Sequence, residues 1–442
     1  MQDETQFAFD GSNNPLIQNI VLKRPEQFAI GESPQVSLHL LIKNGESCVG
    51  RLLTNVGPYI DEIVAVVNDT TDKTIEILRE YVEFRGTGFR LDIVDVTYAT
   101  HPELYLLDVP ETYAIGKSLS GEAYDGPFTG KPLLANWAAV RNLGWKRCTK
   151  EWILFLDVDD VIRDPEAIPG LCEAMKLRDV ELGCTRYVYS RTENGGSQSE
   201  SYRERLIRNL PRIAWTGLVH EILEGQRKTA YINDNLIVDD MKDNQGVDVR
   251  LSGRCFKVLY HDARSRDWKI SARNFIYLAL EAKVTHPDIS LSALDRYLEL
   301  SLWPEERAWA CAMAGEIHEN RKDYARASEW YERSLAEHPG PKSACRLCRS
   351  RFHEGRWQES VDAYRLGMEG SYGLQLIDSG PAYENMSKLL VAAALDNLGR
   401  LEDAVTMCRE AVKAFPNNSA VQKLMEHLDE RLKSRIGCKS KP

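Results

Sequence analysis

The 442-residue sequence contains no apolar run that approaches the ~20 residues needed for a membrane-spanning helix. Its first ten residues, MQDETQFAFD, also lack the basic and then apolar start of a secretory signal. We therefore expect a soluble, cytoplasmic protein without a membrane span.

An excess of positive charge is also missing. The chain has 66 acidic and 56 basic side chains, which gives a formal net charge of −10 and argues against a nucleic-acid-binding surface. Its 43% hydrophobic and 28% charged residues are typical of an ordinary globular protein. A chain of this length exceeds the size at which single cores stop growing, so we expect two or three domains.

The ten cysteines do not form an obvious disulfide or zinc pattern. Cys345 and Cys348 make one CxxC, but no second pair stands at zinc spacing, and both lie in a segment with a helical pattern. We therefore interpret the cysteines as reduced, mostly buried thiols.

The first half of the chain alternates short, continuously apolar runs with helical patterns. The runs are VSLHLLI (36–42), EIVAVV (62–67), LDIVDV (91–96) and WILFLDV (152–158), and helices are expected at 49–56, 74–82 and 133–145. This alternation predicts an α/β domain with a mostly parallel sheet and helices on both faces. We assign it to residues 35–250, after an irregular lead-in over residues 1–34.

Beyond about residue 265, helical patterns dominate and three segments resemble one another. They are KDYARASEWYERSL, GRWQESVDAYRLGM and GRLEDAVTMCREAV. Their small residues Ala327, Ser360 and Ala404 are 33 and 44 positions apart, close to the 34-residue period of tetratricopeptide repeats with one insertion. We expect an all-α repeat domain over residues 301–435 after a helical connector at 251–300. Such repeats either bind peptides or act only as a stabilising cap.

Ligands of such sheets bind beyond the carboxyl ends of the strands. Asp157 and Asp159 form a DxD directly after an apolar run, where two carboxylates can hold a hard divalent cation against a diphosphate. A charged loop without a metal is the alternative. The long stretch 101–131, rich in Gly, Pro and Tyr, suggests an insertion near the same edge.

Four segments, taken in order, resemble family 2 of the glycosyltransferases, which have the nucleotide-sugar-binding fold called GT-A. They are SLHLLIKNGES, DEIVAVVNDTTDKTIEIL, NWAAVRNLGWKRCTKEWILFLDVDDVI and WTGLVHE, and the resemblance covers residues 35–225. It implies an inverting transferase that moves a sugar from a nucleotide diphosphate sugar, a UDP-sugar first of all. The implied cofactor is Mn²⁺ or Mg²⁺.

The resemblance also implies where the nucleoside binds. Lys43 and Asn44 after the first strand, with Asn68 and Asp69 after the second, would grip it. Family members commonly carry Asp near position 68, so Asn68 leaves open which nucleobase is bound. Alternatively, the segment from Asn68 to Asp72 is a turn and helix cap.

The remaining implied ligands surround the diphosphate. Asp157 would lie near the ribose, and Asp159 would ligate the cation, with Asp157 and His220 completing its shell. Arg141, followed by Asn142, would brace the site, although a solvated helical arginine is equally compatible with the sequence. Arg205 and Arg208, with Arg203 and Arg212, would either line the phosphates or be surface charge.

Glu221 is the candidate general base, because an inverting displacement needs a carboxylate near the acceptor hydroxyl. Asp239 and Asp240, after the apolar run LIV, are rivals, and an ion pair with an arginine is the structural alternative for Glu221. The repeats make a protein or peptide acceptor plausible.

Two other functions are alternatives to a glycosyltransferase. One is a scaffold in which the α/β domain has lost activity. The other is a nucleotidyltransferase, which would offer a Gly-rich, basic loop after the first strand. KNGES matches that loop poorly.

Overall fold

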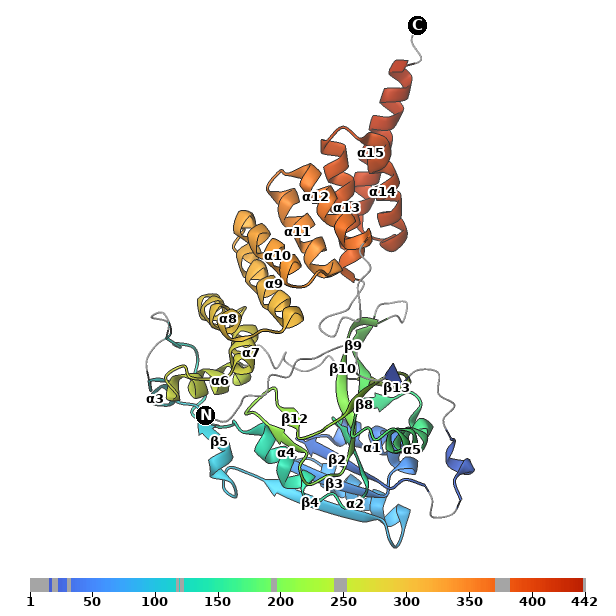
Figure 1. Cartoon of the computed structure of the whole chain (residues 1–442), viewed down its shortest axis with the longest axis vertical. Helices are drawn as coiled ribbons and strands as arrows, with labels where there is room; N and C mark the ends of the chain where they lie inside the picture. Colours follow the sequence, from blue (N-terminus) through green and yellow to red (C-terminus); the bar gives the residue numbers. More distant parts are fainter. Residues whose placement is uncertain are drawn as a thin grey trace. The chain divides into compact units, whose positions relative to one another are not determined.

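The structure is a computed structural model that describes residues 16–17, 23–29, 33–116, 119, 123–191, 197–241, 253–369 and 382–439. The chain divides into two compact units (Figure 1). The first runs to residue 269 without residues 119–122, and the second comprises these four residues and residues 270–442.

The first unit is built on a nine-stranded sheet in the order β1-β13-β9-β10-β7-β2-β3-β4, with β8 paired to β13. These strands are β1 (Leu16–Ile17), β2 (Val36–Ile42), β3 (Glu62–Asn68), β4 (Arg90–Val96), β7 (Trp152–Leu156), β8 (Asp160–Ile162), β9 (Leu182–Arg191), β10 (Ser197–Arg208) and β13 (Thr229–Asp240). The strands β7, β2, β3 and β4 are parallel, as expected.

The sheet as a whole is mixed, which corrects the expectation of a mostly parallel one. Strand β10 runs antiparallel to both β7 and β9, and β8 runs antiparallel to β13. The reason is the length of the connection, because only five residues separate β9 from β10. A parallel pair would need a crossover of a dozen or more residues.

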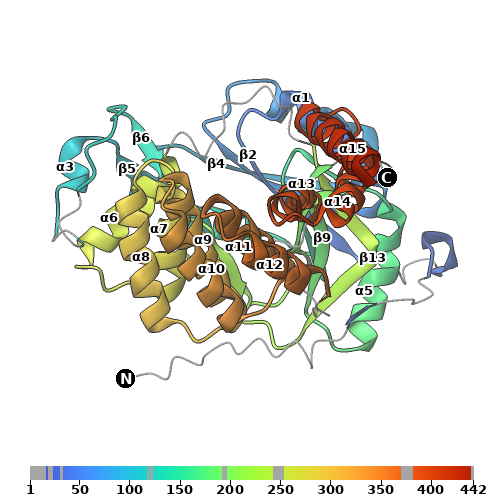
Figure 2. The ribbon, with the colours of Figure 1, turned by 90° about the horizontal axis from the view of Figure 1, so that it is seen from above.

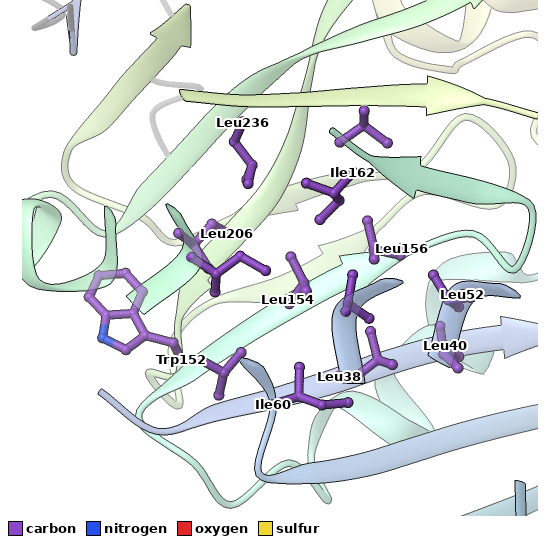
Figure 3. Packing of buried hydrophobic residues seen from close by; sticks show 14 of the residues in the cluster. Leu38, Leu40, Leu52, Ile60, Trp152, Leu154, Leu156, Ile162, Leu206 and Leu236 are labelled. Carbon is purple, nitrogen blue, oxygen red and sulfur yellow. The ribbon is translucent and has the colours of Figure 1, made fainter. Parts of the chain in front are cut away.

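Helices cover both faces of the sheet, which confirms the predicted α/β architecture. One core contains residues of α1 (Glu46–Val56), α2 (Thr74–Arg85) and α5 (Ile168–Leu177). Figure 3 shows its centre, where Leu38 and Leu40 of β2 lie beside Leu154 and Leu156 of β7. A second, smaller core is formed by different side chains of the sheet and includes Val140 of α4 (Trp137–Trp145). Alternation along each strand divides its side chains between the two cores.

The predicted 101–131 insertion contains β5 (Tyr105–Leu107) and α3 (Pro110–Tyr113), and β6 (Pro132–Leu134) follows it directly. Because β6 pairs with β5, helix α4 begins at Trp137 rather than at residue 133 as we expected. Two short strands, β11 (Ala214–Thr216) and β12 (Ile222–Glu224), form a separate hairpin, and α6 (Arg254–Ser265) completes the first unit.

The second unit is all-helical within its described residues. It contains α7 (Ala272–Ala282), α8 (Pro287–Leu300), α9 (Pro304–Asn320), α10 (Tyr324–Glu337), α11 (Pro341–His353), α12 (Trp357–Glu369), α13 (Ala382–Asn397), α14 (Leu401–Ala414) and α15 (Ser419–Lys439). Figure 2 shows α9 to α12 stacked in chain order.

The three similar segments become α10, α12 and α14, the second helices of three helix pairs. Their small residues Ala327, Ser360 and Ala404 are fully buried, as close helix packing requires. The extra residues that lengthen one spacing fall between α12 and α13, at 370–381, outside the described residues. The all-α repeat architecture is therefore confirmed.

Candidate functional site

The carboxyl ends of β2 and β3 lie at one edge of the sheet because the two strands are parallel and adjacent. Each is followed by a residue with left-handed backbone, Asn44 at φ 52° and Asp69 at φ 47°. The Asn44 side-chain oxygen accepts a hydrogen bond from the Thr71 amide at 2.8 Å, which ties the two loops together. Lys43 lies exposed at the start of this edge.

Asn68, where the family commonly has Asp, is buried at the end of β3. Its amide nitrogen donates to the Tyr105 hydroxyl at 2.6 Å and to the Val96 carbonyl at 3.0 Å. The Tyr105 hydroxyl in turn donates to the Asp69 carboxylate at 3.4 Å. Asn68 is therefore used within the protein, whereas Asp69 is held at the edge.

The DxD follows β7, and Asp157 forms part of a buried charge cluster. The Arg205 guanidinium, 1% exposed, lies 3.3 Å from Asp157 and 3.2 Å from Asp160. Asp160 also accepts from the Tyr187 hydroxyl at 2.8 Å and from the Asp157 amide at 2.9 Å. Arg205 lies against two aromatic rings, 5.1 Å from the Phe155 centroid and 4.7 Å from that of Tyr187.

This cluster shifts the pKa values of Asp160 and Arg205. Burial, together with the neighbouring Asp157, raises the pKa of Asp160 to about 7 against the opposing effect of Arg205. Burial disfavours the Arg205 charge, but Asp160 and Asp157 reverse that effect and raise its pKa. Arg205 is therefore a fixed cation beneath the DxD.

The loop that carries Asp159 is held through its backbone. The Asp159 carbonyl accepts from Arg51 of α1 at 3.3 Å and from the Met241 amide at 3.2 Å. The Asp157 side chain is 35% exposed, so its carboxylate is accessible from solvent. The donor set, two carboxylates at a strand end, matches the hard oxygen ligands that Mg²⁺ and Mn²⁺ prefer.

Side chains of the described residues alone do not complete a metal shell around the DxD. Among the described residues, no group of three His, Cys, Asp or Glu side chains with mutually close ligand atoms includes Asp157 or Asp159. In particular, His220 is not gathered with them. A cation here would need oxygens of its ligand as well.

The WTGLVHE segment forms the β11–β12 hairpin, which is held on α4. Asn142 and Trp215 exchange two hydrogen bonds, at 2.8 and 3.0 Å, and the Trp137 amide donates to the Leu218 carbonyl at 2.7 Å. The turn requires left-handed backbone at Gly217, φ 95°, and at His220, φ 52°. Glycine adopts that conformation without strain, whereas histidine is uncommon there.

Glu221 ends this turn and forms an ion pair with Arg141 of α4, and the two side chains are 10% and 12% exposed. The Arg141 guanidinium also lies 4.5 Å from the Phe155 ring centroid and 5.1 Å from that of Trp215. Its Nη1 is buried and has no hydrogen-bond partner in the described part of the chain. Arg141 thus joins the hairpin to β7, two residues before the DxD.

Residues 111–230, which include α4, the DxD and the hairpin, match the family model for glycosyl transferase family 2. The first unit carries a family 2 glycosyltransferase domain. Among curated proteins, none matches the chain.

Several solved structures resemble the repeats at low identity. The tetratricopeptide-repeat domain of OM64 from Arabidopsis is 14% identical, with a TM-score of 0.25, and covers 29% of this chain and 98% of its own. The repeat domain of Sgt2 from Aspergillus fumigatus is 14% identical, with a TM-score of 0.26, 30% coverage of this chain and 85% of its own. YrrB, described as having an unusual peptide-binding site, is 17% identical, with a TM-score of 0.32 and coverages of 37% and 79%. None of these similarities identifies a ligand of this chain.

Other predicted site residues of the glycosyltransferase domain lie elsewhere. Arg208 pairs in register with Trp152, at the start of β7, and contacts Asp179 at 3.7 Å. It is therefore at the opposite end of β7 from the DxD. Arg212 lies in an ion pair with Glu181, also away from the strand end that carries the DxD.

The two rival bases differ in their surroundings. Both carboxylate oxygens of Asp239 accept hydrogen bonds from the Arg163 guanidinium, at 2.9 and 3.2 Å. Asp240 pairs in register with Asp160, next to the DxD.

Sequence reasoning missed Asp160 and Tyr187 in this glycosyltransferase domain. Asp160 directly follows Asp159, so a third acidic residue next to the DxD was visible in the sequence. Tyr187 lies in LGCTRYVYSR, and nothing in that run indicates contact with Asp160.

No helix in the described ranges is both long and apolar enough to span a bilayer.

Proposed function

We propose that the protein is an inverting glycosyltransferase that moves a sugar from a nucleotide diphosphate sugar, most simply a UDP-sugar, to an acceptor hydroxyl or amide. The observation that carries this proposal is the Arg141 contact. Its guanidinium joins Glu221, the candidate base, to Phe155 on the strand that ends in the DxD. The donor and acceptor ends of the site are thereby held by one side chain.

In this proposal Lys43, Asn68 and Asp69 form the nucleoside end of the site. Asp69 is the better candidate to read the base, because the Asn68 amide already donates to Tyr105 and Val96. Asp157 would face the ribose. Arg205 supplies positive charge below the phosphates, and the buried Nη1 of Arg141 is a further donor for a ligand oxygen.

Asp157 and Asp159, with His220 as a further candidate ligand, would hold Mn²⁺ or Mg²⁺. The bound cation would offset the charge of the nucleoside diphosphate as it leaves. Glu221 accepts the proton of the acceptor group, whose oxygen or nitrogen forms the new bond to the anomeric carbon while the bond to the diphosphate breaks. Asp240 is the alternative base, whereas both Asp239 oxygens are bound by Arg163.

For the acceptor we propose a protein or peptide bound at the repeats. Stacked helix pairs present an extended surface of the kind that peptides use. The scaffold alternative, a domain that no longer turns over, predicts no nucleotide binding.

The test is isothermal titration of the full chain with UDP, with and without Mn²⁺, on the wild type and on Asp159→Ala. Asp164→Ala is the matched control, because Asp164 is an exposed carboxylate just after β8. Metal-dependent UDP binding that is lost only in Asp159→Ala supports the transferase. Binding of GDP in place of UDP would change only the proposed nucleobase of the donor. If no nucleotide binds under any metal condition, the transferase proposal is wrong and the scaffold alternative replaces it.

A further inference from the structure

Strand β10 carries two arginines past the middle of the sheet towards the DxD. It pairs with β7 over Leu206–Arg208 and continues beside β9 as far as Ser197. Arg205 therefore lies next to the DxD, and the Cα of Arg203, two residues further out, is about 7 Å beyond that of Arg205. Both guanidiniums contact the Tyr187 ring, at 5.7 Å for Arg203 and 4.7 Å for Arg205. Arg203 is thus the next cation outward from the candidate diphosphate site.

Arg203 differs from the other arginines with described side chains on β9 and β10. Arg186, Arg205 and Arg208 each form an ion pair with an acidic residue. Arg203 is exposed, and it makes no ion pair or hydrogen bond with the described residues. Its guanidinium carries five N–H donors and stays charged at every pH at which a protein works. It is therefore a permanent cation that solvent and ligands can reach.

The surroundings of Arg203 are acidic. Partial burial disfavours its charge, but Tyr189, Glu204 and Asp157 outweigh that effect and raise its pKa. An anionic group that enters beside the DxD is repelled by these carboxylates unless a cation faces it, whereas a neutral group needs no such cation. Arg205 cannot serve in this way, because two carboxylates already share it. Arg203 is the cation that can.

An aromatic surface adjoins Arg203. Tyr189 of β9 is 37% exposed, and its ring packs edge-on against the Tyr187 ring, with the centroids 4.9 Å apart. Its hydroxyl lies 3.0 Å from the Ser201 hydroxyl of β10, which holds the ring in place. A tyrosine of this kind offers an apolar face with a polar edge. Such a surface suits a sugar ring, whose C–H groups need an apolar neighbour and whose hydroxyls need a polar one.

The order of groups in the donor determines what would lie at this position. In a nucleotide diphosphate sugar, the sugar is bonded to the phosphate that is further from the nucleoside. With the nucleoside end at Asp69 and the diphosphate at the DxD, the sugar extends outward to Arg203 and Tyr189. A carboxylate on the sugar could accept two parallel hydrogen bonds from the Arg203 guanidinium, the geometry that arginine matches best.

We propose that Arg203 selects a donor whose sugar carries a carboxylate, a nucleotide diphosphate hexuronic acid, and that Tyr189 packs against the sugar ring. This inference rests on the proposed function, because it names the class of sugar that the transferase accepts. A neutral hexose fills the same space but leaves Arg203 without an anion. Discrimination between the two sugars therefore depends on one side chain.

The experiment is isothermal titration of the full chain, in the presence of Mn²⁺, with UDP, UDP-glucose and UDP-glucuronic acid. The two sugars differ in one hydroxymethyl group that is a carboxylate in glucuronic acid. We expect UDP-glucuronic acid to bind at least about tenfold more tightly than UDP-glucose, because its hydrogen bonds to Arg203 are charge-assisted. Arg203→Gln should bind the two within about twofold of one another, and Arg203→Lys should keep part of the preference.

Two controls separate the sugar from the nucleotide. The affinity for UDP itself should be the same in Arg203→Gln as in the wild type, because Arg203 lies beyond the diphosphate. Arg79→Gln, an exposed arginine on α2, should keep the full preference for UDP-glucuronic acid. The melting temperature of each variant shows whether it is folded.

The possible outcomes are distinct. Equal binding of the two sugars by a wild type that binds UDP would overturn this inference and leave the transferase in place. Loss of UDP binding in a folded Arg203→Gln would assign Arg203 to the diphosphate instead. If no nucleotide binds, both proposals are wrong. If GDP binds in place of UDP, the comparison of GDP-mannose with GDP-mannuronic acid decides the inference in the same way.

Discussion

At the scale of single residues, the candidate site depends on ion pairs that are largely removed from solvent. Arg141 and Glu221 are both mostly buried, and Arg205 lies between two carboxylates and two aromatic rings. Electrostatic interactions are stronger where water is excluded, so these cations are fixed in position before any ligand binds. Changes that keep shape but remove charge are therefore the informative ones.

Glu221→Gln tests the proposed base. The amide keeps an oxygen to accept from Arg141 but cannot take a proton, so we expect kcat to fall by about 100- to 10,000-fold. The Kd for UDP should change by less than about threefold. Glu224→Gln, an exposed residue of the same hairpin, is the control for both measurements. Full kcat in Glu221→Gln would transfer the base role to Asp240.

His39 gives a prediction for pH. It is fully buried on β2, its Nε2 lies 3.1 Å from the Arg141 carbonyl, and burial together with Arg141 lowers its pKa to about 3. The unfolded chain binds a proton near pH 6.5 and the folded chain does not, so stability falls as the pH drops from about 6.5 towards 3. This histidine alone contributes up to about 1.4 kcal/mol per pH unit.

The measurement is urea unfolding of the wild type and His39→Gln at pH 7.5, 6 and 5. The variant keeps an N–H donor for the Arg141 carbonyl but has no group that titrates in this range. We expect the wild type to lose more free energy of unfolding than the variant between pH 7.5 and 5. Parallel pH curves for the two proteins would show that His39 is protonated in the folded state.

At the scale of elements, α6 holds the 101–131 insertion in place. Lys257 of α6 donates to Asp108 at 2.8 Å and to the Pro127 carbonyl at 2.8 Å, and Arg264 donates to the Ile115 carbonyl at 2.6 Å. Burial would raise the pKa of Asp108, but the donors Lys257, Thr129 and Tyr113 hold it below its usual value. A buried charge pair therefore holds the described part of the insertion on α6.

Lys257→Met should release the insertion, because it leaves the Asp108 charge buried without its cation, at a cost of about 3–5 kcal/mol. We expect chymotrypsin to cut after Phe128 at least tenfold faster than in the wild type. Lys269→Met, an exposed lysine beyond α6, should not change the rate. The double variant Asp108→Asn, Lys257→Met should recover part of the protection, and no recovery would contradict the charge-pair explanation.

Elements with strong local patterns could be predicted, and others could not. The strands at 36–42 and 62–67 are buried on both faces, so their apolar runs are continuous and readable, whereas in the strand at 91–96 only Val94 and Val96 are buried. Strand β10, SQSESYRERLIR, is mostly polar and is specified by its pairing with β7 and β9. Its direction, and with it the mixed character of the sheet, depends on contacts between distant residues.

The candidate site shows the same division. The position of Asp157 after an apolar run was visible, because a strand end can be located from the sequence. The burial of Arg205 between Asp157 and Asp160 was not, because it depends on the register between β10 and β7. The same register places Arg208 three residues away at the other end of β7, although both arginines look alike in the sequence.

At the scale of the whole molecule, each of the two units has its own core, so one should unfold without the other. Gly315 on α9 tests this, because a Cβ there would lie 2.5 Å from Tyr331 Cε1. We expect Gly315→Ala to destabilise the repeats by about 1–3 kcal/mol through overpacking. Calorimetry should show that the repeats unfold at a lower temperature than in the wild type. The affinity for UDP, measured by titration, should stay unchanged.

Gly50→Ala on α1 is the control, because a Cβ added at Gly50 would lie within 4 Å of no neighbouring atom. This substitution should raise stability by about 0.5–1 kcal/mol through helix propensity. A Gly315→Ala protein that loses UDP binding along with its repeats would show that the two units unfold together.

The thiols of the chain provide a built-in chemical probe. None of the nine cysteines with described side chains is in a disulfide, and among them only Cys48 and Cys255 are partly accessible, both in the first unit. Cys311, Cys345, Cys348 and Cys408 are buried among the repeat helices. A short pulse of an alkylating reagent, read by peptide mass spectrometry, would therefore time the opening of each repeat in the native protein without any engineered label.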